Sequence, residues 1–205
     1  MNLLNLFKPK QTDVSETKPV IIVSGLPRSG TSMMMKILDA GGLEIVTDNE
    51  RTADEDNPKG YYEFEIVKQL GDGSEADWVN QAEGKVVKVI SFLLQHLPSN
   101  HSYKVIFMRR NVEEILASQQ QMLARRGETS TDSDERVADT FQEHLKRVRV
   151  WLANQKNIQV LYVDYNSLMK EPQGPIQGVY DFLGLPLDLE KMIAVPDTKL
   201  YRQRK

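Results

Sequence analysis

The chain has 205 residues, 40% hydrophobic and 27% charged, with a formal net charge of −3, which fits one soluble globular domain. Because it contains no cysteine, the sequence excludes disulfides, thiolate metal sites and cysteine nucleophiles. The negative net charge also argues against nucleic acid as a partner, so any polyanion would have to be held by a local cluster of cations.

Residues 1–18 are expected to be a flexible lead-in, and residues 19–205 a single α/β domain. The start, MNLLNLFKPK, lacks the charged beginning and long apolar core of a secretory signal. No stretch approaches the run of about 20 apolar residues that crosses a bilayer. We therefore expect a cytoplasmic protein with no membrane span.

Short β-branched runs alternate with helical patterns along the rest of the chain. Strands are expected at residues 20–25, 85–90, 104–108 and 158–163. Helices are expected at residues 32–40, 61–70, 112–126 and 134–154, with a short helix near Tyr165. Strands that alternate with helices predict a three-layer α/β domain, in which a mostly parallel sheet is covered on both faces.

The segment GLPRSGTS, residues 25–32, lies between the first expected strand and the first expected helix. Its two glycines have the spacing of a phosphate loop, in which the backbone approaches an anion closely and the amides of the helix start point at it. Arg28 adds a permanently charged planar fork for phosphate or sulfate oxygens. The alternative is a plain strand–turn–helix connection with a capping hydroxyl.

Thr31 stands where a nucleotide triphosphatase carries the lysine that bridges the β- and γ-phosphates. This difference weakens an ATPase or GTPase interpretation. The segment PRSGTS resembles instead the 5′-phosphosulfate loop of the sulfotransferase family, and the resemblance implies a P-loop-like fold that binds the sulfuryl donor PAPS. Arg28 would then contact the phosphosulfate, and the 5′-phosphate would be cradled by Ser29, Gly30, Thr31 and Ser32.

The family also binds the 3′-phosphate of PAPS, with an arginine at a strand end and a serine eight residues later. The segment KVIFMRRNVEEILAS supplies Arg110 and Ser118 at that spacing. Arg109 is a neighbouring candidate, because adjacent strand residues face opposite ways. The alternative is that Arg110 makes a surface ion pair and that Ser118 is merely helical. The final YRQRK would either close over the nucleotide or fray.

Sulfuryl transfer needs cations around the transferred group and a base for the proton of the acceptor. Lys88 matches the lysine of the family's Lys-Thr-His sequence, but Ile90 replaces the histidine. The three histidines of the chain are expected to be surface or structural residues. A carboxylate is therefore the expected base, with Asp48 as the first candidate and Glu50 as the second. Arg51 would orient one of the nearby carboxylates or bind an acidic acceptor. The further candidates for the base are Asp54, Glu55, Asp56, Glu63 and Glu65.

Three functions fit these motifs. The first is a PAPS-dependent sulfotransferase that releases PAP and acts on a hydroxyl or amine of a small molecule, carbohydrate or peptide. The second is a P-loop kinase or nucleotide hydrolase, and the third is a module that binds PAPS or PAP without turnover. The sulfotransferase interpretation requires no metal, and the sequence offers no ligand cluster for one.

Overall fold

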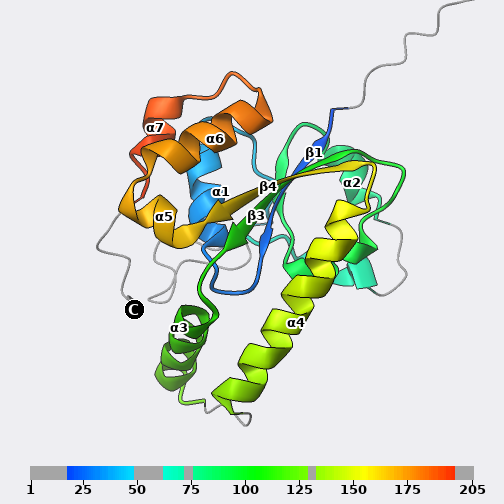
Figure 1. The fold of residues 1–205 in the computed structure, drawn as a ribbon. Helices are drawn as coiled ribbons and strands as arrows, with labels where there is room; N and C mark the ends of the chain where they lie inside the picture. The colour runs from blue at the N-terminus through cyan, green and yellow to red at the C-terminus, as the bar shows by residue number, and fades with distance from the viewer. Residues whose placement is uncertain (1–17, 49–61, 72–75, 129–132, 197–205) are drawn as a thin grey trace, which may run out of the picture.

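The computed structural model describes residues 18–48, 62–71, 76–128 and 133–196. Within these residues the core is a four-stranded parallel sheet in the order β2-β1-β3-β4 (Figure 1). The strands are β1 (Val20–Gly25), β2 (Val86–Lys88), β3 (Tyr103–Arg109) and β4 (Ile158–Asp164). Of the expected lead-in, residues 1–18, all but residue 18 lie outside the described part.

Helices cover both faces of this sheet (Figure 1). The long helices are α1 (Thr31–Ala40), α3 (Val112–Arg125), α4 (Asp134–Ala153) and α6 (Gln173–Leu183). The short ones are α2 (Trp78–Gln81), α5 (Tyr165–Lys170) and α7 (Leu189–Ile193), with 3₁₀ turns η1 (Glu65–Gly71) and η2 (Ser91–His96). No helix in the described ranges is long and apolar enough to cross a membrane.

The alternation of side chains along β1 divides the core into two layers. Ile21 and Val23 pack with α1, α5, α6 and α7, whereas Val20 and Ile22 pack on the other face with α2, η1, η2 and α4. All four side chains are at most 1% exposed. A strand that is buried on both faces has a continuous β-branched sequence, as VIIV has here. The expected three-layer α/β fold is confirmed.

The expected strands and long helices are present, with small shifts at their ends. The helix expected over residues 61–70 is present only in part, because residues 62–64 have no regular structure and a 3₁₀ helix covers Glu65–Gly71. The sequence analysis did not anticipate α2, η2 or α7. Each of them is short, and short helices are stabilised by tertiary packing rather than by a periodic sequence pattern that could be recognised in advance.

Parallel strands place all their carboxyl ends at one edge of the sheet. The chain leaves β1 through α1 on one face, and it connects β3 to β4 through α4 on the other. The connections therefore diverge between β1 and β3, which lie side by side. Ligands of open α/β sheets bind at such a switch point, beyond the carboxyl ends of the strands. Gly25, Lys88 and Arg109 end their strands at this edge.

His144 of α4 is buried against η2. Its Nε2 lies 2.9 Å from the Ser91 hydroxyl, and its ring stacks on Phe92 with centroids 3.8 Å apart. Burial, together with the nearby Arg147 guanidinium, lowers the pKa of His144 below its ordinary value. This environment agrees with the structural role expected for the histidines.

The lowered pKa of His144 predicts a stability loss in mild acid. The unfolded chain takes up the histidine proton as pH falls through about 6.5, whereas the folded protein resists it until lower pH. The free energy of unfolding should therefore decrease as the pH is lowered from 7.5 to 5.5. The decrease should be smaller in His144→Gln, which keeps a polar partner for Ser91. Urea unfolding at both pH values measures the difference, and equal losses in the two proteins would refute the assignment.

Candidate functional site

The loop between β1 and α1 folds into a tight turn that two glycines make possible. Gly30 has φ of +99°, and a Cβ atom there would lie 2.9 Å from Cε2 of Tyr165. A Cβ atom on Gly25 would lie 2.5 Å from the Ser29 hydroxyl and 2.7 Å from the Met108 carbonyl oxygen. Any side chain at either position would displace its neighbours, so the two glycines allow the loop to pack closely against β3 and α5.

The start of α1 has no side-chain cap in the part of the chain that the structure describes. The N-cap residue of α1 is Gly30, which offers no side-chain hydrogen bond to the first turn. The Ser29 hydroxyl is buried, with the residue 1% exposed, and has no hydrogen-bond partner among the described residues. Helix-start amides and a buried hydroxyl without a partner both favour an anion, because unpaired buried donors are costly.

Arg28 joins the loop to α3. It has φ of +68°, a left-handed conformation that is rare for a residue with a side chain. Its Nε donates a hydrogen bond of 3.0 Å to the Ser118 hydroxyl, across 90 residues of sequence. The structure thus brings together two residues from separate motifs, as a shared nucleotide site requires. Strained backbone of this kind typically costs about 1–3 kcal/mol and concentrates at functional sites.

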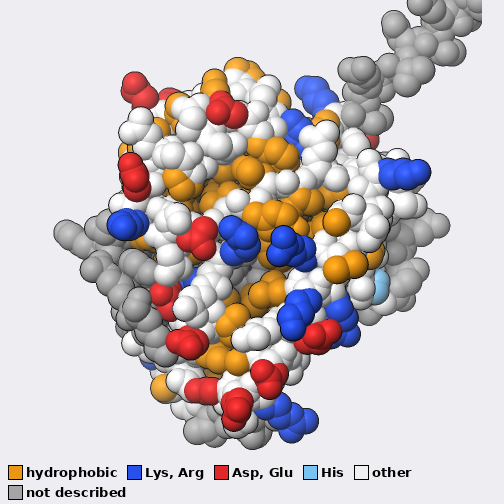
Figure 2. Space-filling view, viewed as in Figure 1, with side chains coloured by type: hydrophobic (Ala, Val, Ile, Leu, Met, Phe, Trp, Pro, Cys, Tyr) orange, Lys and Arg blue, Asp and Glu red, His pale blue; other side chains and the backbone are white. Residues whose placement is uncertain are grey.

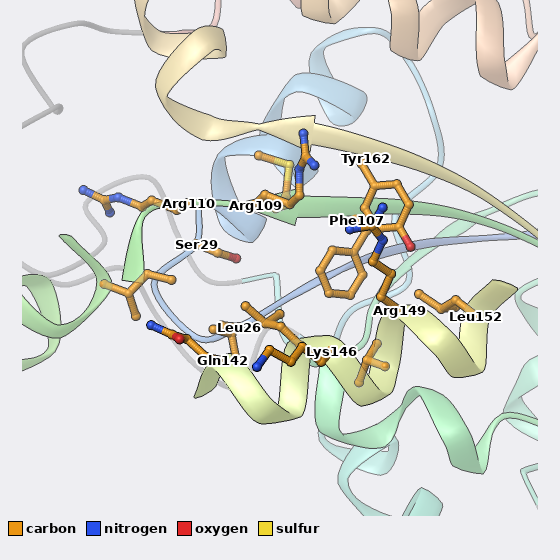
Figure 3. A pocket seen from close by; sticks show the side chains of 14 residues that line it. Leu26, Ser29, Phe107, Arg109, Arg110, Gln142, Lys146, Arg149, Leu152 and Tyr162 are labelled. Carbon is orange, nitrogen blue, oxygen red and sulfur yellow. The ribbon is translucent and has the colours of Figure 1, made fainter. Parts of the chain in front are cut away.

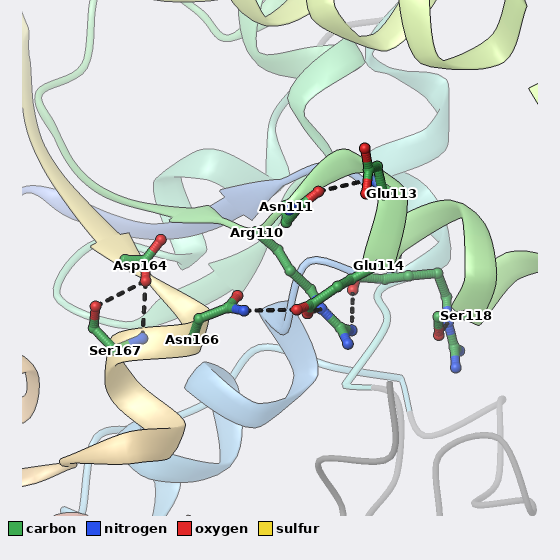
Figure 4. Close-up of polar contacts among 9 residues, drawn as sticks. Arg110, Asn111, Glu113, Glu114, Ser118, Asp164, Asn166 and Ser167 are labelled. Atoms are coloured by element: carbon green, nitrogen blue, oxygen red, sulfur yellow. Dashed lines mark hydrogen bonds and ion pairs between the residues drawn. The ribbon is translucent and has the colours of Figure 1, made fainter. Parts of the chain in front are cut away.

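Arg110 lies beside the loop in a buried network (Figure 4). Its Nε donates to Glu114 Oε2 at 3.0 Å, and its Nη1 donates to the Arg28 carbonyl oxygen at 3.1 Å. Asn166 Nδ2 donates to the other Glu114 oxygen at 2.8 Å. Arg110 also lies over the Tyr165 ring, 4.5 Å from its centroid. The ion pair that was an alternative for Arg110 therefore exists, but it is buried and it braces the phosphate loop.

Tyr165 closes this network from α5. Burial raises the pKa of Tyr165, with Arg110 acting in the opposite direction and Glu114 adding to the rise. The phenol therefore stays protonated at neutral pH and contributes a neutral wall to the site. Sequence analysis missed Tyr165, Asn166 and Glu114 as site residues. Glu114 was detectable in principle, because it follows Arg110 by four residues, a spacing that supports an ion pair along a helix.

Lys88 ends β2 and faces the loop that precedes η1. Its Nζ lies 3.5 Å from Glu63 Oε1, and the two side chains are only 7% and 22% exposed. Thr47 fixes this segment by donating to the Glu63 carbonyl oxygen at 2.7 Å. Glu63, a further carboxylate candidate of the sequence analysis, is therefore in contact with the candidate lysine.

The other base candidates have different positions. Asp48 accepts a hydrogen bond of 2.6 Å from the backbone N–H of Glu65, so it caps η1. Glu65 pairs with Lys68. Ile90, in the position of the family's histidine, is 38% exposed. Glu50, Arg51, Asp54, Glu55, Asp56 and the YRQRK tail lie outside the described residues.

Several large side chains near the site pack in the core or at its border. Trp78 is buried and meets Phe64 edge-on, with centroids 6.0 Å apart. Met34 and Met35 are fully buried between α1 and the sheet. Tyr62 donates a hydrogen bond to Asp39, and burial with this carboxylate raises its pKa to about 12.

A cavity of about 390 Å³ opens on the α4 face of the sheet, directly beside the phosphate loop (Figure 3). Its walls come from the loop, the ends of β3 and β4, and the sheet-facing side of α4. The lining residues are Leu26, Ser29, Phe107, Met108, Arg109, Arg110, Ile115, Gln142, Leu145, Lys146, Val148, Arg149, Leu152 and Tyr162. A concave, mostly apolar site with a few polar groups is typical of small-molecule binding.

These features define a class of protein: an α/β domain with a P-loop-like turn at the carboxyl edge of a parallel sheet. The family model for the sulfotransferase domain matches residues 18–201, and the chain belongs to that family. No curated protein matches the sequence.

Solved sulfotransferases share the fold. One is the sulfotransferase domain of the Synechococcus PCC 7002 olefin synthase, with 18% identity and a TM-score of 0.50, covering 97% of this chain and 87% of that one. Another is STF1 from Mycobacterium tuberculosis H37Rv, with 16% identity and a TM-score of 0.57, covering 88% of this chain and 72% of that one. At these identities the likeness concerns the fold.

Proposed function

We propose that the protein transfers a sulfuryl group from PAPS to a hydroxyl or amine acceptor and releases PAP. The observation that carries the proposal is the hydrogen bond between Arg28 and Ser118, because it unites the phosphate-loop motif with the second anchor. The family match supports sulfotransfer as the chemistry. The absence of a Walker lysine at Thr31 disfavours the kinase alternative.

The donor site follows from the loop geometry. Ser29, Gly30, Thr31 and Ser32 would cradle the 5′-phosphate at the start of α1. Arg28 would contact the phosphosulfate, while Arg110 and Ser118 would hold the 3′-phosphate. The left-handed backbone and the packed glycines fix the loop before the donor arrives, and such preorganisation lowers the cost of binding.

The transfer step needs a positive charge near the leaving oxygen and a base near the acceptor. Lys88 would stabilise the charge that develops as the sulfur–oxygen bond breaks, and Arg28 would share that role. Glu63 would take the acceptor proton, and its contact with Lys88 favours it over Asp48, whose carboxylate caps η1. Without a suitable base, the same site would bind PAP and not turn over.

Two substitutions test this assignment. In Glu63→Gln, loss of general-base catalysis should lower kcat by about 10²–10⁴, and Lys88→Ala should lower it by about 10²–10³. PAP affinity should change little in Glu63→Gln. The measurement is PAP release from PAPS with a panel of phenols, amines and sugars.

Glu65→Gln is the matched control, because Glu65 is paired with the exposed Lys68. Asp48→Ala should cost stability at η1 rather than rate, because it removes the oxygen that caps that turn. Unchanged kcat in both Glu63→Gln and Lys88→Ala would remove the mechanism. PAP binding without any PAP release by the unmodified protein would favour the non-catalytic module.

A further inference from the structure

The cavity beside the phosphate loop has two chemically different parts. Its floor is apolar and is formed by Leu26, Phe107, Leu145, Leu152 and Tyr162. Its rim carries cations: Arg109 at the end of β3, and Lys146 and Arg149 on α4 (Figure 3). Figure 2 shows hydrophobic side chains lining a hollow on this face, with lysine and arginine side chains over its edge.

The rim cations have little compensating negative charge. Neither Arg109 nor Arg149 pairs with a carboxylate in the part of the chain that the structure describes. Arg109 lies over the Tyr162 ring, 5.6 Å from its centroid. Among the described carboxylates, Lys146 reaches Glu143 alone, at 4.0 Å between two exposed side chains, a contact that contributes little. The protein carries a net charge of −3, so this concentration of cations is local.

Helical spacing explains why these charges meet at the cavity. Residues 142, 145, 146, 149 and 152 all line it, and they repeat at three- and four-residue intervals on one side of α4. Leu145 and Leu152 reach inward toward the sheet, whereas Lys146 and Arg149 flank them with long stems and charged ends. The helix therefore presents an apolar surface bordered by positive charge.

We propose that this cavity holds the acceptor, and that the acceptor is an anionic hydroxyl compound with a flat apolar body. This inference rests on the proposed function. The apolar body would lie on Phe107 and Leu145, and its carboxylate, sulfate or phosphate would meet Arg149, Lys146 and Arg109. Leu26 and Ser29 line the same cavity, so the bound molecule would border the phosphate loop.

The chemistry balances without a further reactant. The acceptor hydroxyl oxygen bonds to sulfur, and the bond from sulfur to the 5′-phosphate oxygen breaks. That phosphate oxygen keeps the electron pair and leaves as part of PAP, while the hydroxyl proton passes to the base. The positive rim plays no part in these bond changes and acts only on which acceptor enters.

A pair of probes that differ by one carboxylate tests the inference. Protein saturated with PAP is titrated by calorimetry with 6-hydroxy-2-naphthoate and with 2-naphthol. The acid should bind at least about tenfold tighter, the effect of one good charge-assisted contact. In the double variant Lys146→Gln and Arg149→Gln the preference should disappear. Arg147→Gln, which removes a cation from α4 that does not line the cavity, should keep it.

Equal affinity for the two probes would overturn the inference, as would a preference that survives in the double variant. Competition between the acid and PAP would also overturn it, because the cavity would then hold nucleotide rather than acceptor. PAP is titrated first, so a protein that fails to bind PAP contradicts the proposed function as a separate result. PAP affinity in the double variant shows that the fold is intact.

Discussion

Arg28→Ala is expected to lower kcat/KM for PAPS by about 10²–10³, the typical effect of losing one well-placed charged contact at a preorganised site. The guanidinium is the permanent charge of the phosphate loop, and its hydrogen bond to Ser118 ties it to α3. Arg28→Lys should recover only part of the loss, because lysine cannot reproduce the planar fork. Initial rates of PAP release at varied PAPS concentration measure the effect.

The control for Arg28→Ala is Arg126→Ala, which removes an exposed arginine just beyond α3. It should leave kcat/KM within about twofold, because a surface charge away from the site contributes little. If Arg28→Ala behaved like this control, the phosphate loop would not be the donor site.

Glu114→Ala is expected to destabilise the fold by about 3–5 kcal/mol, the cost of breaking a buried ion pair by removing one partner. Glu114 is 1% exposed and bonds both Arg110 and Asn166, so its loss leaves a guanidinium and an amide without that carboxylate. Urea unfolding with the midpoint and slope fitted together measures the change. The slope separates a true stability change from a change in the unfolded state.

Glu113→Ala provides the comparison for Glu114→Ala, because it removes the same charge from the exposed side of α3. Its loss should stay near or below about 1 kcal/mol. A drop of that small size in Glu114→Ala would mean that the Arg110 network does not brace the loop.

The sheet and the phosphate loop were predictable from sequence for local reasons. VIIVSG has the β-branched run of a doubly buried strand, and the glycines of GLPRSGTS allow the close turn that follows. Both signals lie within a few consecutive residues. The family resemblance then assigned Arg110 and Ser118, and the structure places both at the loop.

The remaining contacts of the site depend on distant segments. Asn166 donates a hydrogen bond to Glu114 across 52 residues of sequence. Lys88 contacts Glu63 although η1 and α2 separate the two residues along the chain. No periodic pattern reports such pairs, because they arise only when the topology brings separate loops together. The sequence favoured Asp48 as the base for lack of this information, and that assignment stays a prediction.

Two adjacent arginines show how the pleat of a strand divides functions. Arg109 lies over Tyr162 on the α4 face, whereas Arg110 lies over Tyr165 on the α5 side. Successive side chains of a strand point to opposite faces, so only one of the pair can brace the phosphate loop. The other is left to border the cavity. Sequence analysis anticipated the division and favoured Arg110 for the nucleotide site, with Arg109 as the neighbouring candidate.

Calorimetric titration with PAP, beside AMP and magnesium-ATP, tests the central claim most directly. The account predicts that PAP binds clearly tighter than AMP, because Arg110 and Ser118 add contacts to the 3′-phosphate, and that magnesium-ATP binds weakly. Ser118→Ala should narrow the gap between PAP and AMP. Equal affinity for PAP and AMP, with tight magnesium-ATP binding, would contradict the donor site and point to a kinase.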